Sequence, residues 1–131
     1  MTMRVPAYRF WRDIRGATAM ELALLLPVFV MLIFGLINTS LMAGALSGMH
    51  YAVEEASRCY AVNKTTCATI DATRTYAQGK YRGPGAQPTF AITTAGCGHT
   101  VTATTTFDLE LALTVLHVPL SATACYPGVA A

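Results

Sequence analysis

The chain has 131 residues, of which 53% are hydrophobic and only 12% are charged, and its formal net charge is +2 at pH 7. Soluble globular proteins usually carry about 25% charged residues, so this composition indicates that much of the surface faces lipid or other subunits. The small net charge and the lack of a long basic stripe argue against nucleic-acid binding. The length allows one domain and a membrane element, but not two full domains.

The basic residues are concentrated at the N-terminus. Asp13 is the only acid before Gly16, whereas four arginines stand there, at Arg4, Arg9, Arg12 and Arg15. Basic and acidic residues are nearly balanced in the rest of the chain. Residues 1–16 are therefore predicted to form a short basic leader.

An apolar run follows the leader. Glu21 is the only charged residue between Ala17 and Ala45, and the stretch Leu22–Met42 is long enough for a transmembrane helix. We therefore predict a transmembrane helix over residues 17–45. Pro27 lies early in this run and is expected to kink its first turns, because proline removes a helical hydrogen bond.

The arginines predict the orientation of this helix, because positive residues that flank a span stay in the cytoplasm. The N-terminus is then cytoplasmic, and residues 46–131 form an exported domain. A cleavable secretory signal is the alternative interpretation, because small residues gather at Ala43–Ala45. The apolar run is, however, longer than the core of about 7–15 residues that such signals have.

All the cysteines lie in the predicted exported domain, at Cys59, Cys67, Cys97 and Cys125. An even count in an exported segment predicts two disulfides, and four cysteines allow three pairings. We favour Cys59–Cys67, which closes a short loop, and Cys97–Cys125, which ties the start of a strand to the end of the chain. Zinc binding is the competing hypothesis, but no pair has the CxxC spacing of a zinc site.

Helical periodicity continues beyond the predicted span, and a helical stem is expected over residues 46–82. Apolar residues recur at three- and four-residue steps at Leu41, Ala45, Met49, Ala52, Ala56 and Tyr60. Glu54, Glu55 and Arg58 fall on the opposite, wet side. A second helix is expected over residues 68–81, after which the sequence RGPGAQP, residues 82–88, ends the helical pattern.

Residues 88–126 are predicted to be β-rich, because threonine and β-branched residues alternate in part. Strands are expected at Thr89–Thr94, Thr100–Phe107 and Pro119–Cys125, with a hairpin turn at Gly96–Gly98. Asp108–His117 fits either a short helix or a strand. The predicted fold class is therefore α+β: a long N-terminal helix and a small antiparallel sheet of three strands packed on it.

The sequence offers no support for catalysis, a metal site or a cofactor. His50, His99 and His117 stand far from one another, and no nucleophile elbow, phosphate loop or HExxH motif occurs. Asp108 and Glu110 would share one face of a strand, but a solvated surface explains such a pair. We expect a protein that is not an enzyme.

One motif is specific: a basic leader, Gly16, Glu21 five residues later, and then the apolar run. It resembles the prepilin cleavage motif of type IV pilins and pseudopilins. The wider stretch from Gly16 to Arg58 resembles the TadE-like family of the Flp/Tad pilus system. Its shared elements are Gly16, Glu21, Pro27, Gly35 and the segment Glu55–Arg58.

The resemblance implies a pilin-like fold and cleavage by a prepilin peptidase between Gly16 and Ala17, with Glu21 as a charge used in assembly. Major Flp pilins carry tyrosine after this glutamate and are much shorter, so Leu22 and the chain length favour a minor pilin or pseudopilin. The implied partners are the peptidase, the pilus platform of the bacterial inner membrane, the major pilin and other minor pilins.

Physical chemistry gives Glu21 two explanations. A carboxylate near hydrocarbon is costly unless it is paired, and cleavage would create an ammonium at Ala17, about one helical turn away, for a neighbouring subunit to match. Alternatively, Glu21 reaches the membrane surface and is favoured by the positive end of its own helix. A function of another class, a membrane-anchored binding or adhesin-like module, would need neither Gly16 nor Glu21.

Overall fold

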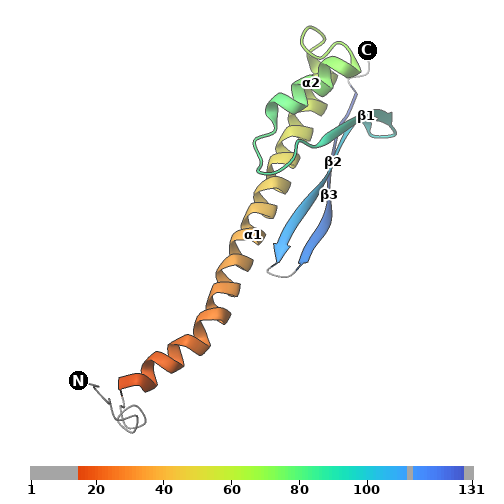
Figure 1. Ribbon diagram of the computed structural model, residues 1–131. Coiled ribbons are helices and arrows are strands. Elements are labelled where there is room, and N and C mark those ends of the chain that lie inside the picture. The colour runs from red at the N-terminus through yellow and green to blue at the C-terminus, as the bar shows by residue number, and fades with distance from the viewer. Residues whose placement is uncertain (1–14, 112–113, 129–131) are drawn as a thin grey trace, which may run out of the picture. The chain divides into compact units, whose positions relative to one another are not determined.

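The computed structural model describes residues 15–111 and 114–128, so most of the predicted leader, residues 1–14, lies outside the described part of the chain. Two helices are followed by three strands: α1 (Arg15–Val62), α2 (Ile70–Lys80), β1 (Thr89–Ala95), β2 (Gly98–Leu111) and β3 (Thr114–Tyr126) (Figure 1). The predicted α+β class, a long apolar helix and a small antiparallel sheet, is confirmed. The chain divides into two compact units, Met1–Leu36 and Ile37–Ala131.

The described part of the first unit is the N-terminal half of α1. Leucine, methionine and alanine are strong helix formers, and they dominate this segment. The helix continues through Pro27 without a break. Every side chain described between Ala19 and Leu36 is exposed.

In the second unit, one stripe of α1 is buried. Its fully buried members are Ala45, Met49, Ala52, Val53 and Ala56. The predicted stripe is therefore largely correct, but Leu41 is 43% exposed and Val53 takes a place in the core that was not predicted. Glu54 and Arg58 are exposed, as expected, whereas Glu55 is half-buried.

The sheet has the order β1-β2-β3, and both pairings are antiparallel. A two-residue turn at Gly96 and Cys97 joins β1 to β2, as the sequence predicts. Gly98 begins β2 with φ +125°, and a Cβ atom there would clash with the carbonyl oxygen of Tyr126. Only glycine fits such a position.

The ambiguous segment Asp108–His117 belongs to two strands. β2 extends to Leu111 and β3 begins at Thr114, so the described parts of this segment form the end of a β-hairpin rather than a helix. Phe107 faces Val118 and Leu109 faces Leu116 across the pair. These apolar cross-strand pairs favour strands, which explains why the two strands are longer than the sequence predicts.

The core lies between α1 and one face of the sheet. The sheet contributes Phe90 and Ile92 from β1, Val101 and Ala103 from β2, and Leu120 and Ala122 from β3. These residues occur at alternate positions because side chains on one face of a strand recur every second residue. The largest fully buried side chains are Phe90, Met49, Val53 and Val101.

The helix α2 covers the outer edge of β1. Thr69 caps α2, since its Oγ1 accepts a hydrogen bond from the backbone N–H of Ala72 at 3.2 Å. Arg74 pairs with Asp71 at 2.7 Å and donates a hydrogen bond from Nε to the carbonyl oxygen of Phe90 at 3.2 Å. This hydrogen bond joins α2 to β1 at Phe90, one of the most deeply buried residues of the core.

The loop after α2 approaches α1 closely at Gly48. A Cβ atom added to Gly48 would lie 2.9 Å from the backbone nitrogen of Gly83, which is too close without movement of the backbone. At Gly44, one turn earlier, an added Cβ would lie 3.6 Å from Pro84 Cδ, an ordinary contact. The two glycines therefore have different roles in the same helix.

We predict opposite effects for alanine at these two glycines. Gly48→Ala should lower the free energy of unfolding by about 1–3 kcal/mol, because the methyl group meets backbone. Gly44→Ala should raise it by about 0.5–1 kcal/mol through better helix propensity. Urea unfolding of the full chain in detergent, followed by circular dichroism, measures both. An increase for both variants would contradict the close approach.

Tyr81 supplies a prediction for alkaline pH. Its side chain is 6% exposed, and its hydroxyl donates a hydrogen bond to the carbonyl oxygen of Pro84 at 2.9 Å. Burial raises the pKa of Tyr81 above its ordinary value of 10.0. The folded state therefore favours the neutral phenol, and this contribution is complete below pH 10 and is lost as the pH rises through the raised pKa.

Tyr81→Phe should cost about 1 kcal/mol at pH 7, because the hydrogen bond is lost. Above pH 10, however, the stability of the variant should fall less steeply than that of the wild type. Unfolding free energies measured in urea at several pH values between neutral and strongly alkaline test this. Parallel curves for the two proteins would show that Tyr81 does not contribute to the alkaline loss of stability.

Candidate functional site

The residues of the predicted cleavage and assembly motif lie at the start of α1. The helix begins at Arg15, so Gly16 and Ala17 are in its first turn, and Glu21 follows in its second. The side chain of Glu21 is exposed. The N–H groups of a first helical turn have no partner within the helix, so this turn is held by fewer backbone hydrogen bonds than the middle of α1.

Helical spacing places Ala17 and Glu21 on one face of α1. Residues four apart are neighbours on a helix surface, and four residues rise about 6 Å along the axis. A carboxylate at this place is close enough to the helix start to be favoured by the positive end of the helix dipole. The geometry is thus compatible with both explanations that the sequence leaves open for Glu21.

An apolar surface surrounds α1 after Glu21. Large side chains are exposed on all sides, among them Leu24 at 70%, Phe29 at 61% and Leu36 at 70%. A helix that is apolar all round is buried in protein or in a membrane. Within the part of the chain that the structure describes, α1 is the one helix long and apolar enough to cross a membrane, and a signal sequence would share these properties.

The second unit contains two disulfides. Cys59 is bonded to Cys67, with Cα atoms 5.8 Å apart, and Cys97 is bonded to Cys125, with Cα atoms 6.4 Å apart. This is the pairing that the sequence favours over its two alternatives. All four thiols are consumed, so they are not available as zinc ligands.

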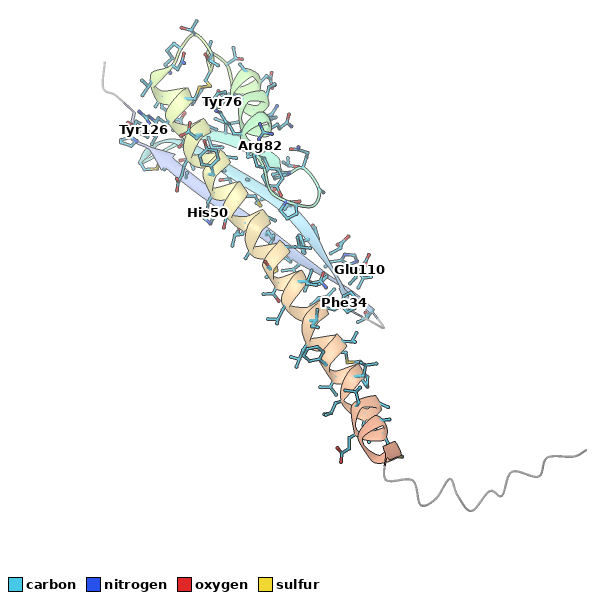
Figure 2. All side chains as sticks on the ribbon, turned by 90° about the vertical axis from the view of Figure 1, so that its left-hand side faces the viewer. Phe34, His50, Tyr76, Arg82, Glu110 and Tyr126 are labelled. Carbon is cyan, nitrogen blue, oxygen red and sulfur yellow. A yellow bond between two sulfur atoms is a disulfide. The ribbon has the colours of Figure 1, made fainter. Side chains whose placement is uncertain are left out.

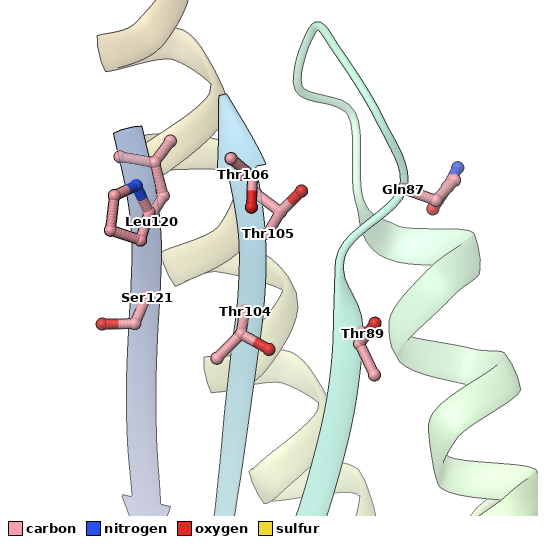
Figure 3. Close-up of a pocket in the computed structure, with 8 residues that line it drawn as sticks. Gln87, Thr89, Thr104, Thr105, Thr106, Leu120 and Ser121 are labelled. Carbon is pink, nitrogen blue, oxygen red and sulfur yellow. The ribbon is translucent and has the colours of Figure 1, made fainter. Parts of the chain in front are cut away.

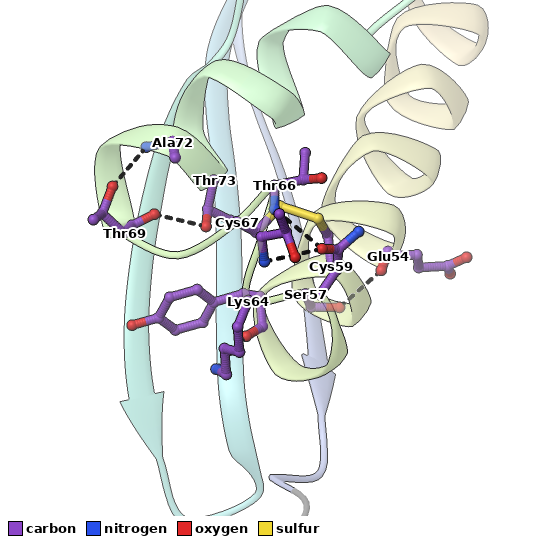
Figure 4. Close-up of a disulfide and its surroundings, with 12 residues drawn as sticks. Glu54, Ser57, Cys59, Lys64, Thr66, Cys67, Thr69, Ala72 and Thr73 are labelled. Atoms are coloured by element: carbon purple, nitrogen blue, oxygen red, sulfur yellow. Dashed lines mark hydrogen bonds between the residues drawn. A yellow bond between two sulfur atoms is a disulfide. The ribbon is translucent and has the colours of Figure 1, made fainter.

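The first disulfide closes the loop that joins the two helices (Figure 4). Within this loop, Asn63 Oδ1 accepts hydrogen bonds from the backbone N–H groups of Thr65 at 3.1 Å and Thr66 at 3.0 Å. Lys64 Nζ donates to the carbonyl oxygen of Tyr60 at 2.7 Å, at the end of α1. The loop is therefore held by its own polar groups, which gives it a structural role.

The histidines do not form a metal site. His50 is exposed, the His99 ring packs edge-on against Tyr60 with centroids 4.7 Å apart, and His117 Nδ1 lies 2.5 Å from Asp108 Oδ1. Among the residues that the structure describes, no group of three His, Cys, Asp or Glu side chains is placed to hold a metal ion. Asp108 and Glu110 share the outer face of β2 and are exposed.

Hydroxyl groups line the outer face of the sheet. Thr102 and Thr123 face each other across β2 and β3, with their Oγ1 atoms 3.2 Å apart. Nearby, an open depression is lined by Gln87, Thr89, Thr104, Thr105, Thr106, Pro119, Leu120 and Ser121 (Figure 3). These side chains offer hydrogen-bond donors and acceptors but no titratable group, so the depression is suited to contact rather than to acid–base chemistry.

The sequence indicates a threonine-rich sheet, but it does not reveal the Asp108–His117 pair or which hydroxyl groups meet across the strands. Both depend on the register of the hairpin, which pairs Asp108 with His117 and Thr104 with Ser121. The available signal was the alternation of threonines at positions 102, 104 and 106. That alternation marks a strand with one polar face, but it does not identify the partner strand.

Comparison with known protein families gives one match. Residues 16–58 match the family model described as TadE-like protein. Comparison with curated proteins and with solved structures gives no match. The matched segment begins at Gly16 in the first turn of α1, contains Glu21 and the exposed apolar surface, and ends at Arg58, just after the buried stripe of the helix. The similarity to TadE-like proteins thus covers residues 16–58, about a third of the chain.

Proposed function

We propose that this protein is a membrane-anchored minor pilin or pseudopilin that takes part in assembly of an Flp/Tad-type pilus. In this proposal the leader is cytoplasmic, α1 crosses the bacterial inner membrane, and the sheet domain lies outside. The partners are the prepilin peptidase, the inner-membrane pilus platform, the major pilin and other minor pilins. The observation that carries the proposal is the TadE-like match over the segment that begins at Gly16 and includes Glu21.

Cleavage after Gly16 would change the charge at the membrane. It would remove the four arginines of the leader and leave a new ammonium at Ala17. Positive residues hold a span in its orientation, so their loss would free the helix to leave the membrane. The position of Gly16 in the first turn of α1 supports this step, since helix ends fray.

Glu21 would then match the ammonium of a neighbouring subunit. An unpaired carboxylate is costly in an apolar environment, and Glu21 is exposed at the start of an apolar surface. When subunits pack side by side through that surface, a charge pair between Glu21 and the Ala17 amine of a neighbour neutralises both groups. Such a pair fixes the axial register of the subunits more than it adds stability.

A second function has one specific observation in its favour. The open, hydroxyl-lined depression on the outer face of the sheet is compatible with a membrane-anchored binding or adhesin-like module. Such a module needs an anchor but no cleavage and no charge at position 21. Substitutions at Gly16 and Glu21 therefore distinguish the two functions.

We predict that the protein isolated from its native host begins at Ala17, and that it begins at Met1 in a strain without the prepilin peptidase. Gly16→Leu should leave the full-length form, because the peptidase recognises the small residue before the cut. Intact-mass spectrometry gives the N-terminus in each case. Gly35→Ala is the matched control, since an added Cβ at Gly35 meets no atom within 4 Å, and this variant should be cleaved normally.

Two other results would contradict the cleavage. A native chain that begins at Met1 in the presence of the peptidase would leave a plain membrane anchor. A chain that begins near residue 46 would identify the apolar run as a secretory signal instead.

We further predict that Glu21→Gln is cleaved normally but fails in assembly. The amide keeps the shape of the side chain and removes its charge, so the neighbour's ammonium loses its partner. A loss of about 1–2 kcal/mol for each subunit contact corresponds to roughly a five- to thirtyfold weaker contact, and the number of assembled pili should fall by at least that much. Counting surface pili in a deletion strain complemented with each variant measures this. Wild-type piliation with Glu21→Gln would favour the other explanation, in which the Glu21 carboxylate interacts only with the positive end of its own helix dipole.

A further inference from the structure

The end of the β2–β3 hairpin carries apolar side chains that the core does not cover. Val115 is 49% exposed and Leu116 is 53% exposed. Leu116 lies opposite Leu109 on the same face of the sheet as the core, and Val115 lies opposite Glu110 on the outer face. Figure 2 shows Glu110 and Tyr126 at opposite ends of the sheet. Apolar side chains are therefore exposed on both faces at this one end of the sheet.

Contacts within the second unit fix the direction of β2 along α1. His99, near the start of β2, packs against Tyr60, near the end of α1, with ring centroids 4.7 Å apart. Phe107, farther along β2, lies beside Gly85, where an added Cβ would be 3.6 Å from its ring. The preceding residue, Pro84, covers Gly44 of α1 at a similar distance. β2 thus runs back along α1, from the level of Tyr60 to that of Gly44.

Beyond Phe107, the hairpin continues past the core. Leu111 is four residues farther along β2, which corresponds to about 13 Å of strand. Ile37 is seven residues before Gly44 in α1, which corresponds to about 10 Å of helix. The hairpin end therefore extends to about the level of Ile37, the first residue of this compact unit.

That level coincides with the outer end of the apolar run. Ile37 is 50% exposed and Leu41 is 43% exposed, whereas Met42 packs against the core and Ala45 is fully buried. If α1 spans the membrane, as proposed above, the hydrocarbon boundary of the outer leaflet falls near Ile37, because the polar residues Asn38, Thr39 and Ser40 follow it and Met42 packs against the core.

We infer that the end of the β2–β3 hairpin inserts into the headgroup region of the outer leaflet, with the side chains of Val115 and Leu116 in contact with lipid. This inference rests on the proposed membrane anchor and adds a second lipid contact to it. Insertion is shallow, because the Glu110 carboxylate lies next to Val115 across the strands and a carboxylate is excluded from hydrocarbon. The Asp108–His117 pair, one step farther from the tip, remains among the headgroups.

Tryptophan fluorescence with brominated lipids tests the inference. Trp11 in the leader is the only native tryptophan, so Trp11→Phe gives a blank background in the full chain. Leu116→Trp is the reporter at the hairpin end. Thr123→Trp, on the same strand but at the opposite end, is the matched control, and Phe29→Trp reports on the span. Each is reconstituted in phosphatidylcholine vesicles brominated either near the headgroup or deep in the acyl chain.

The expected result is a decrease of about twofold in the fluorescence of Leu116→Trp with bromine near the headgroup, and little change for Thr123→Trp. Phe29→Trp should be quenched most by the deep bromines. Because tryptophan at position 116 changes the core-side face, Val115→Trp on the outer face is a second reporter and should be quenched like Leu116→Trp.

Three results would overturn the inference in different ways. If Phe29→Trp is quenched but both hairpin reporters match Thr123→Trp, the anchor stands and the hairpin does not touch lipid. A blue-shifted, unquenched emission of the reporters that depends on protein concentration would assign the hairpin end to a second copy of the chain instead. If Phe29→Trp is unquenched as well, the membrane anchor itself fails.

Discussion

The close packing of α1 against the inner face of the sheet is the constraint on which the second unit depends. Alanines at positions 45, 52 and 56 have small side chains, so the helix can approach the sheet closely. Met49 and Val53 then pack in the same core as the side chains of the sheet. Interiors are packed as densely as organic crystals, so a larger residue in this stripe would push the helix away. The same closeness brings the loop at Gly83 against Gly48 and sets where α2 lies on β1.

This constraint also marks a change of environment along a single helix. Before Leu36 the exposed side chains of α1 are large, with leucine, phenylalanine and isoleucine all round, whereas the buried stripe after Met42 consists mainly of small residues. Large apolar side chains are compatible with lipid, because lipid chains adapt to an irregular helix surface. Small side chains are needed where the backbone of α1 must lie close to the sheet. The switch in side-chain size, rather than in hydrophobicity, separates the two parts of α1.

Much of this fold is encoded locally and was predictable. The apolar run, the helical stripe, the glycine turn at Gly96 and the disruption at residues 82–88 all act over a few residues, and the structure agrees with each. The lengths of β2 and β3 were not predictable, because Asp108–His117 has no clear period of its own. Its conformation is decided by pairs such as Leu109 with Leu116, which a single strand does not reveal.

The candidate site also has a part that could be predicted from sequence and a part that could not. Gly16, Ala17 and Glu21 form a linear motif, so sequence alone gives their spacing, and the helix adds only that Ala17 and Glu21 share a face. The cleavage and the charge pair between subunits remain predictions, because they involve other molecules. The pairing of hydroxyl groups across the sheet and the exposed hairpin end were not predictable from sequence, because they arise only when two strands are brought into alignment.

The disulfide between Cys97 and Cys125 has a consequence for that alignment. The outer face of β2 repeats threonine at positions 102, 104 and 106, so neighbouring pairings with β3 differ little in their polar contacts. A slip by two residues would keep every side chain on its face and would be hard to reject by polarity alone. The bond closes a ring around the whole hairpin, with Cys125 opposite Thr100. Strands that separate during export or folding thus remain joined at one end, and they re-form with the original pairing rather than one of its near-equivalents.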